Sequence, residues 1–307
     1  VTITRHAKVE SVMIEEGAFA GLLVTRMPSG LSEKIEAQCA IVATGGKSYP
    51  ATGSTGDGYH FAEATGHRLA PLQPSLVSIE TRPVFDGATG LNLKNVQLTL
   101  WIDGKKHSSE FGEADFTAKG LGGPIVLRLS RKIVHALAAG QKVEVTLDLK
   151  PALDPPKLEA RLLRDLESSE TCGHVLRALL PSQLVEVFSR TLGLTQAAPT
   201  ALLKAPKRKQ LINLLKELRF EVTGHGSWEE AIVTAGGVSL KDIDPRTMGS
   251  KKIENLFFAG EVMDLDANTG GYNLQIAFST GWLAGEAAAS KALEVSSLKY
   301  ADPPLDK

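Results

Sequence analysis

The sequence has little cysteine and no long apolar run. Its two cysteines, Cys39 and Cys172, lie outside any CxxC spacing, which argues against a disulfide framework and a thiolate metal site. The seven histidines form no HxxxH pair, so no metal site is predicted. No stretch approaches the ~18 apolar residues of a membrane span, and no signal peptide is recognisable. We therefore expect a cytoplasmic protein with no membrane partner.

Excess charge of either sign is also lacking. The 34 basic and 35 acidic side chains leave a net charge of -1, so no nucleic-acid partner is expected. The one dense basic cluster, residues 204–209, contains Pro206 and opens a predicted helix. We interpret it as a solvated helix end. At 307 residues the chain exceeds the ~100–200 residues of one domain, which predicts two or three units.

Alternating β-rich segments dominate the first half of the chain. Residues 8–14, 19–25 and 34–44 predict a meander, whose last strand ends in the apolar run Ile41, Val42 and Ala43 before two glycines. A strand buried on both faces is typical of a parallel sheet. A helix over residues 57–65 follows. Residues 76–79, 96–102 and 142–149 predict further strands, with a hairpin turn at Asp103 and Gly104.

Helical periodicity replaces the β pattern after Pro151. One helix is already predicted at residues 124–139, and residues 158–166, 182–192 and 208–218 predict a small helical unit. Strand patterns return at residues 220–223, 231–234 and 253–259, and a helix over about 272–293 ends the pattern. Its small residues Ala277, Gly281, Gly285 and Ala289 recur every four positions, which would allow close packing on a sheet.

The strongest chemical signal is IENLFFAGE at residues 253–261, an apolar strand that ends in Gly260 and Glu261. The following loop reaches TGGYNLQ at residues 269–275, where the last helix begins. Paired glycines let a ligand approach the backbone, and the free N–H groups of the first helical turn favour an anion. This corner therefore predicts a ligand-binding site.

Three motifs together resemble one bacterial family. They are ATGGKSYP at residues 43–50, TGSTGDGY at residues 52–59, and the run from VTAGGV at residues 233–238 through Gly260 and Glu261 to Gln275. The sequence resembles the YhiN/BaiN-type flavoproteins, which are described as aminoacetone-oxidase-like FAD-binding enzymes, and the resemblance spans nearly the whole chain.

The resemblance implies an α/β fold, namely a partial glutathione-reductase-like FAD-binding fold with an inserted β-rich, barrel-like domain and a small helical subdomain. We assign residues 1–74 and 236–307 to the FAD-binding domain, residues 75–150 and 218–235 to the β-rich domain, and residues 151–217 to the helical subdomain. The implied function is that of an FAD-dependent oxidoreductase acting on an unknown small molecule, with NAD(P)H as a candidate electron donor.

The resemblance also implies which residues hold FAD. Gly260 and Glu261 would contact the ribityl chain or the diphosphate, and Val9 would offer its backbone to adenine. The dinucleotide would be lined by Ala43, Thr44, Gly45 and Gly46. The pyrimidine end of the flavin would face Gly270, Gly271, Tyr272, Asn273, Leu274 and Gln275. No catalytic residue is assigned, since His225, Glu261 and Tyr272 are candidates by location only.

Two departures from the family pattern keep a second function open. None of the 29 glycines forms the GxGxxG turn that holds a dinucleotide pyrophosphate, so we expect this chain alone to bind FAD poorly. Ala118 stands where relatives often carry His. The alternative is a non-catalytic fragment or scaffold that has lost the pyrophosphate-binding half of its site. A Walker loop at Gly46 is ruled out because Ile41 stands where its first glycine belongs.

Overall fold

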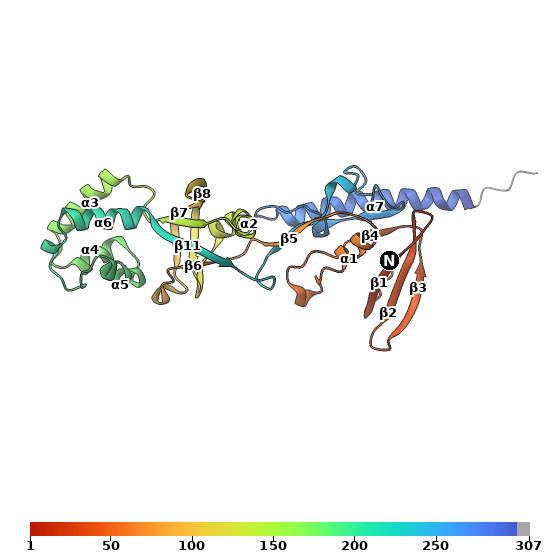
Figure 1. Ribbon diagram of the computed structural model, residues 1–307, viewed down its shortest axis with the longest axis horizontal. Coiled ribbons are helices and arrows are strands. Elements are labelled where there is room, and N and C mark those ends of the chain that lie inside the picture. Colours follow the sequence, from red (N-terminus) through yellow and green to blue (C-terminus); the bar gives the residue numbers. More distant parts are fainter. Residues whose placement is uncertain (300–307) are drawn as a thin grey trace, which may run out of the picture. The chain divides into compact units, whose positions relative to one another are not determined.

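The computed structural model describes residues 1–299, and the side chains of residues 1–294. These residues form two compact units (Figure 1). The first unit comprises Val1–Pro74 and the described residues from Ala231 on, and the second comprises Ser75–Glu230. Each unit has its own hydrophobic core.

The core of the first unit is built on a parallel strand pair. β4 (Ala40–Val42) lies beside β13 (Leu256–Phe258), with Ala40 opposite Leu256 and Val42 opposite Phe258. The parallel arrangement agrees with the prediction. The prediction that this strand is buried on both faces is wrong at Ile41, whose side chain is 39% exposed.

An antiparallel meander precedes this pair. β1 (Ala7–Glu15), β2 (Ala18–Arg26) and β3 (Leu31–Glu36) form a three-stranded sheet in that order. Residues 34–44 are therefore not one strand as predicted. The chain leaves the meander after β3, which pairs with β2, and enters a second sheet at β4, which pairs with β13.

Three further elements complete the first unit. α1 (Asp57–Ala64) follows a loop that contains a short 3-10 helix, η1 (Pro50–Thr52). β5 (Leu69–Ser75) pairs with β12 (Val233–Val238), which places residues 231–235 in this unit. α7 (Tyr272–Lys299) packs on β13, β4 and the 3-10 helix η5 (Gly260–Val262).

The small-residue stripe of α7 does not face the sheet as expected. The buried positions are Thr280, Ala284 and Ala288, whereas a Cβ added to Gly281 or Gly285 would meet no atom within 4 Å. Gly281 and Gly285 therefore lie on a neighbouring side of the helix, which is open among the described residues, whereas Ala277 faces Gly260, where an added Cβ would lie 3.7 Å from the Ala277 Cβ.

This geometry makes Gly281→Ala a stabilising substitution. An added methyl would meet no neighbour, and alanine loses less backbone entropy than glycine inside a helix. We expect the free energy of unfolding to rise by about 0.5–1 kcal/mol, measured by thermal denaturation. A lower stability would show that some other group covers this side of α7.

The second unit is a closed six-stranded barrel with the order β10-β11-β6-β9-β8-β7. The strands are β6 (Ile79–Arg82), β7 (Asn92–Ile102), β8 (Lys105–Phe116), β9 (Gly120–Gly122), β10 (Val143–Asp148) and β11 (Leu218–His225). Asp103 and Gly104 form the predicted hairpin turn between β7 and β8, both with positive φ. α2 (Pro124–Ala138) buries its apolar side chains in the barrel core. The barrel-like insert is thus confirmed.

Four helices interrupt the barrel between β10 and β11. They are α3 (Pro155–Glu167), α4 (Cys172–Leu179), α5 (Ser182–Thr191) and α6 (Ala205–Lys216). The Asp154 carboxylate caps α3 by accepting a hydrogen bond from Lys157 N at 2.8 Å. The buried side chains of these helices and of the barrel form one hydrophobic cluster.

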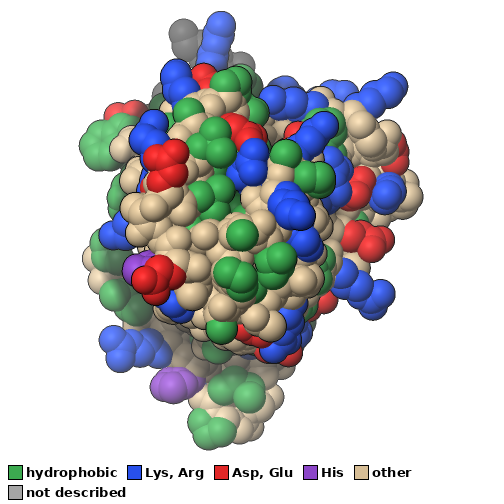
Figure 2. All heavy atoms as spheres, turned by 90° about the vertical axis from the view of Figure 1, so that its left-hand side faces the viewer, with side chains coloured by type: hydrophobic (Ala, Val, Ile, Leu, Met, Phe, Trp, Pro, Cys, Tyr) green, Lys and Arg blue, Asp and Glu red, His purple; other side chains and the backbone are tan. Residues whose placement is uncertain are grey.

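The basic cluster at residues 204–209 lies at the start of α6. Arg208 pairs with Glu159 at 3.1 Å, and Lys207 donates to the Leu192 carbonyl. Figure 2 looks onto the end formed by α3 to α6 and shows basic, acidic and apolar side chains interspersed on that face. Two of the four cations in the cluster are therefore held in internal contacts.

Candidate functional site

The candidate site begins where two parallel strands end. β4 and β13 finish at the same level, since Ala259 N donates to Val42 O at 3.0 Å. The segments that follow, Ala43 with Thr44 and Gly260 with Glu261, leave the sheet next to each other. The carboxyl edge of a parallel sheet is where open α/β folds bind their ligands. Ala43 and Thr44 are exposed there.

Thr234 on β12 joins the two segments. Its hydroxyl accepts hydrogen bonds from Lys47 N at 2.8 Å and Ser48 N at 3.2 Å, and lies 3.1 Å from Ser48 Oγ. Its backbone N–H donates to Glu261 Oε1 at 2.8 Å. Thr234 is completely buried, so this one residue fixes the loop after β4 to the carboxylate after β13.

Glu261 occupies an unusual environment for a carboxyl group. Burial raises the pKa of Glu261 above its ordinary value of 4.5, and the hydrogen bonds from Thr234 only partly oppose this shift. The folded protein thus binds this proton more tightly than the unfolded chain does. The resulting stabilisation is fully present below about pH 4.5 and is lost as the pH rises through the raised pKa.

Glu261→Gln should remove this pH dependence. Glutamine keeps an oxygen that can accept from Thr234 N but carries no charge. We expect the variant to match the wild type near pH 4 and to become more stable than it as the pH rises to about 7, measured by urea denaturation at each pH. A constant difference across this range would contradict the raised pKa.

Two glycines allow the close approach of these segments. A Cβ at Gly46 would collide with Thr234 Oγ1 and Glu261 Oε1. A Cβ at Gly58, in the first turn of α1, would collide with Thr44 Oγ1 and lie 2.9 Å from Val262 Cγ2. The start of α1 is therefore in contact with the ends of both strands.

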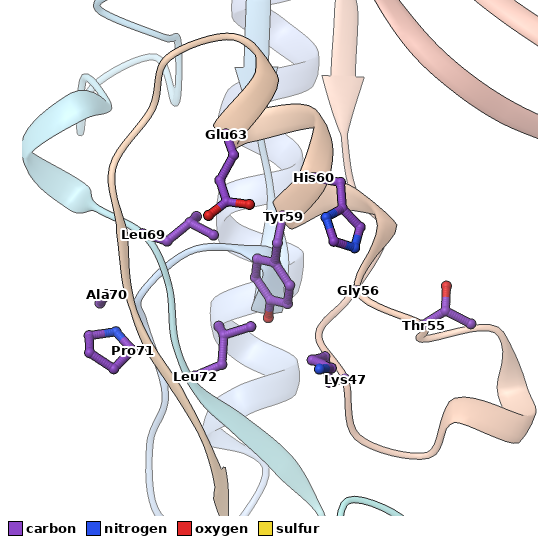
Figure 3. A pocket seen from close by; sticks show the side chains of 10 residues that line it. All are labelled: Lys47, Thr55, Gly56, Tyr59, His60, Glu63, Leu69, Ala70, Pro71 and Leu72. Atoms are coloured by element: carbon purple, nitrogen blue, oxygen red, sulfur yellow. The ribbon is translucent and has the colours of Figure 1, made fainter.

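Tyr59 contacts this corner and also lines a cavity beside α1. Its side chain is buried, and its hydroxyl donates to the Glu261 carbonyl at 3.4 Å. Burial raises the pKa of Tyr59. The cavity is about 320 Å³ in volume (Figure 3) and is lined by Lys47, Thr55, Gly56, Tyr59, His60, Glu63, Leu69, Ala70, Pro71 and Leu72. None of the residues expected to hold FAD lines it.

Val9 lies on β1, opposite Val24 of β2. Its neighbour Lys8 has a raised pKa, chiefly through the hydrogen bond to Glu10 and also through the charge of Asp57.

The start of α7 is the most open part of the site. Gly270 and Gly271 have positive φ, and Tyr272 and Leu274 are more than 60% exposed. Asn273 is different, because its side chain accepts from Ala267 N and donates to Ala267 O, both at 2.8 Å. These two bonds hold the side chain against the preceding loop. Gln275 is exposed and donates to Ser279 Oγ at 2.9 Å.

The three candidate catalytic residues do not share one unit. Glu261 and Tyr272 belong to the first unit, whereas His225 lies on β11 of the second, with Nδ1 2.8 Å from the Gly226 carbonyl. Within residues 1–299, no group of His, Cys, Asp or Glu could hold a metal ion. Thr234, Gly58 and Tyr59 stand in quoted motifs but received no role from the sequence.

Comparison with known proteins settles the family. The HI0933-like protein Rossmann domain matches residues 1–287. The chain belongs to the HI0933-like family. Membership agrees with the expected resemblance, with the α/β fold class and with FAD as the cofactor.

Similar members of the HI0933-like family carry different functional descriptions. The 3-dehydro-bile acid delta(4,6)-reductase of Clostridium scindens is 30% identical over 84% of this chain and 64% of its own length. The ribosomal RNA dihydrouridine synthases of Haemophilus influenzae and Escherichia coli are 32% and 31% identical, over 79% and 92% of this chain and 58% and 66% of their own lengths. The chain thus spans less than two thirds of each relative.

Solved structures are more distant. The FrdA subunit of E. coli quinol fumarate reductase aligns with 94% of this chain and 45% of its own, at 18% identity and a TM-score of 0.40. No helix among residues 1–299 is long and apolar enough to cross a membrane.

Proposed function

We propose that this protein acts as an FAD-dependent reductase whose substrate contains a carbon–carbon double bond conjugated to a carbonyl group. The observation that carries the cofactor site of the proposal is the corner at the ends of β4 and β13, where Thr234 holds the two segments together. The family assignment supports FAD as the molecule held there.

The residues at this corner suit a dinucleotide cofactor. Ala43 and Thr44 are exposed at the carboxyl edge of the sheet, and Gly260 leaves β13 with φ of 75°. Gly45 and Gly46 continue along the same edge. The first turn of α7, from Gly271 to Leu274, would offer backbone N–H groups to the electronegative end of a flavin, whereas the Gln275 N–H donates to the Gly271 carbonyl at 3.0 Å. FAD, once bound, would supply hydride transfer.

The substrate class is inferred from what two relatives' names have in common. One name describes reduction of double bonds in a 3-oxo steroid, and the other describes formation of dihydrouridine, in which the uracil ring gains hydrogen across a double bond. Both substrates place a double bond next to a carbonyl group. The chain's own residues would bind and orient such a compound beside the flavin.

A direct test supplies this protein with FAD, NADH and either a 4-en-3-one steroid or uridine. The proposal predicts substrate-dependent oxidation of NADH and a product that has gained two hydrogen atoms, detected by mass spectrometry. Extending the chain by the upstream segment of a relative should increase the rate. A protein that binds no FAD with or without this segment would favour the scaffold alternative.

A further inference from the structure

Tyr49 has a backbone conformation that its side chain disfavours. Its φ and ψ are 54° and 58°, in the left-handed region, and it immediately precedes Pro50. Side chains with a Cβ rarely adopt this region, and the proline ring further restricts the residue before it. The strain needs a compensating interaction.

Core packing does not compensate the strain at Tyr49. Leu76 and Met248 also have positive φ, but their side chains are 2% and 8% exposed and lie in the protein interior. Glu16 has positive φ in the tight turn between β1 and β2. Tyr49 is 46% exposed, although its neighbour Ser48 is buried.

The backbone on both sides of Tyr49 is firmly held. Ser48 is hydrogen-bonded to Thr234 through its N–H and hydroxyl groups, and the Tyr49 carbonyl accepts from Thr52 N at 2.9 Å and Thr52 Oγ1 at 2.7 Å. Figure 3 shows the segment between Lys47 and Thr55 swinging away from the cavity wall. These hydrogen bonds therefore hold the Tyr49 backbone in its strained conformation while its side chain stays partly exposed.

We propose that Tyr49 is a ligand-contacting residue whose ring stacks on a flat, conjugated ring, either that of the cofactor or that of the substrate. Backbone strain maintained by surrounding contacts is concentrated at functional sites, and an exposed tyrosine ring is a suitable stacking surface. Thr234 fixes both the root of this loop and Glu261, so Tyr49 is tied to the cofactor corner. The inference rests on the proposed function.

Fluorine NMR tests this role without requiring turnover. The chain has four tyrosines, so labelling with 3-fluorotyrosine gives few signals, and loss of one in Tyr49→Phe assigns Tyr49. We would add FAD, then uridine or androstenedione in the presence of FAD. A shift with FAD alone identifies the cofactor as the stacking partner, and a further shift identifies the substrate. An unchanged Tyr49 signal with all three probes would overturn the proposal.

Two variants separate stacking from a structural role. Tyr49→Phe keeps the ring, whereas Tyr49→Asn removes it and suits left-handed backbone. Equilibrium dialysis would measure how each variant binds the probe that shifts the signal. We expect Tyr49→Phe to bind it as the wild type does, and Tyr49→Asn to bind it about tenfold more weakly, which is a loss of about 1.4 kcal/mol in binding free energy. Asn should also raise the melting temperature. Equal binding by the Asn variant, or a lower melting temperature, would overturn the proposal. If the Tyr49 signal shifts but the protein reduces neither substrate, the stacking contact still holds and the proposed reaction is wrong.

Discussion

Thr234→Val is expected to destabilise the first unit by about 2–6 kcal/mol. Valine has nearly the same shape as threonine but cannot accept a hydrogen bond. The N–H groups of Lys47 and Ser48, which now donate to the Thr234 hydroxyl, would lose their acceptor. Each buried donor left unsatisfied costs about 1–3 kcal/mol.

Thr234→Ser is the matched control, since serine retains the hydroxyl and loses only a methyl group. Urea denaturation of the three proteins should place the serine variant close to the wild type and the valine variant well below both. If both variants lose the same free energy of unfolding, the methyl group of Thr234 stabilises the unit and its hydrogen bonds do not. FAD binding should weaken with valine as well, because the loop at residues 43–48 would no longer be fixed.

Phe220→Ala is expected to cost about 3–5 kcal/mol in the second unit. Phe220 is 1% exposed and forms an aromatic cluster in the barrel core, with ring centroids 5.5 Å from Phe85 and 6.2 Å from Phe116. Removing the ring leaves a cavity that the surrounding strands cannot fill. The loss should appear as a lower midpoint in urea denaturation.

Phe111→Ala supplies the control for this measurement. Phe111 lies on β8 of the same unit but is 59% exposed, so its removal should change stability by no more than about 0.5 kcal/mol. Similar losses in both variants would mean that the aromatic cluster does not stabilise the barrel as described.

Local patterns in the sequence predicted the elements around the site. The apolar run before Gly260 marks β13, and the glycines at 270 and 271 mark the start of α7, because each signal is confined to a few neighbouring residues. The same reasoning failed between residues 34 and 44. Every part of that segment has a sequence typical of a strand. It forms two strands because its first part pairs with β2 and its last part pairs with β13.

The connection through Thr234 could not be predicted from the sequence. Thr234 lies 187 residues from Lys47 along the chain, and no local pattern encodes a contact over that separation. The threonine also sits in an apolar, glycine-containing strand, where its hydroxyl gives no sign of its partners. The prediction that the small-residue stripe of α7 packs on the sheet failed for a similar reason. A four-residue spacing marks one side of a helix but does not show what that side faces.

If the corner at Ala43 and Glu261 holds FAD, a glutamate placed there should weaken FAD binding, whereas a glutamate elsewhere on the first unit should not. Ala43 and Ala289 are both exposed in the first unit, but only Ala43 is assigned to the site. We would measure the FAD dissociation constant of the wild type, Ala43→Glu and Ala289→Glu by quenching of flavin fluorescence. We expect Ala289→Glu to bind FAD as the wild type does and Ala43→Glu to bind it at least about tenfold more weakly, because the new carboxylate would repel the diphosphate. Equal FAD affinity in all three proteins would contradict this expectation.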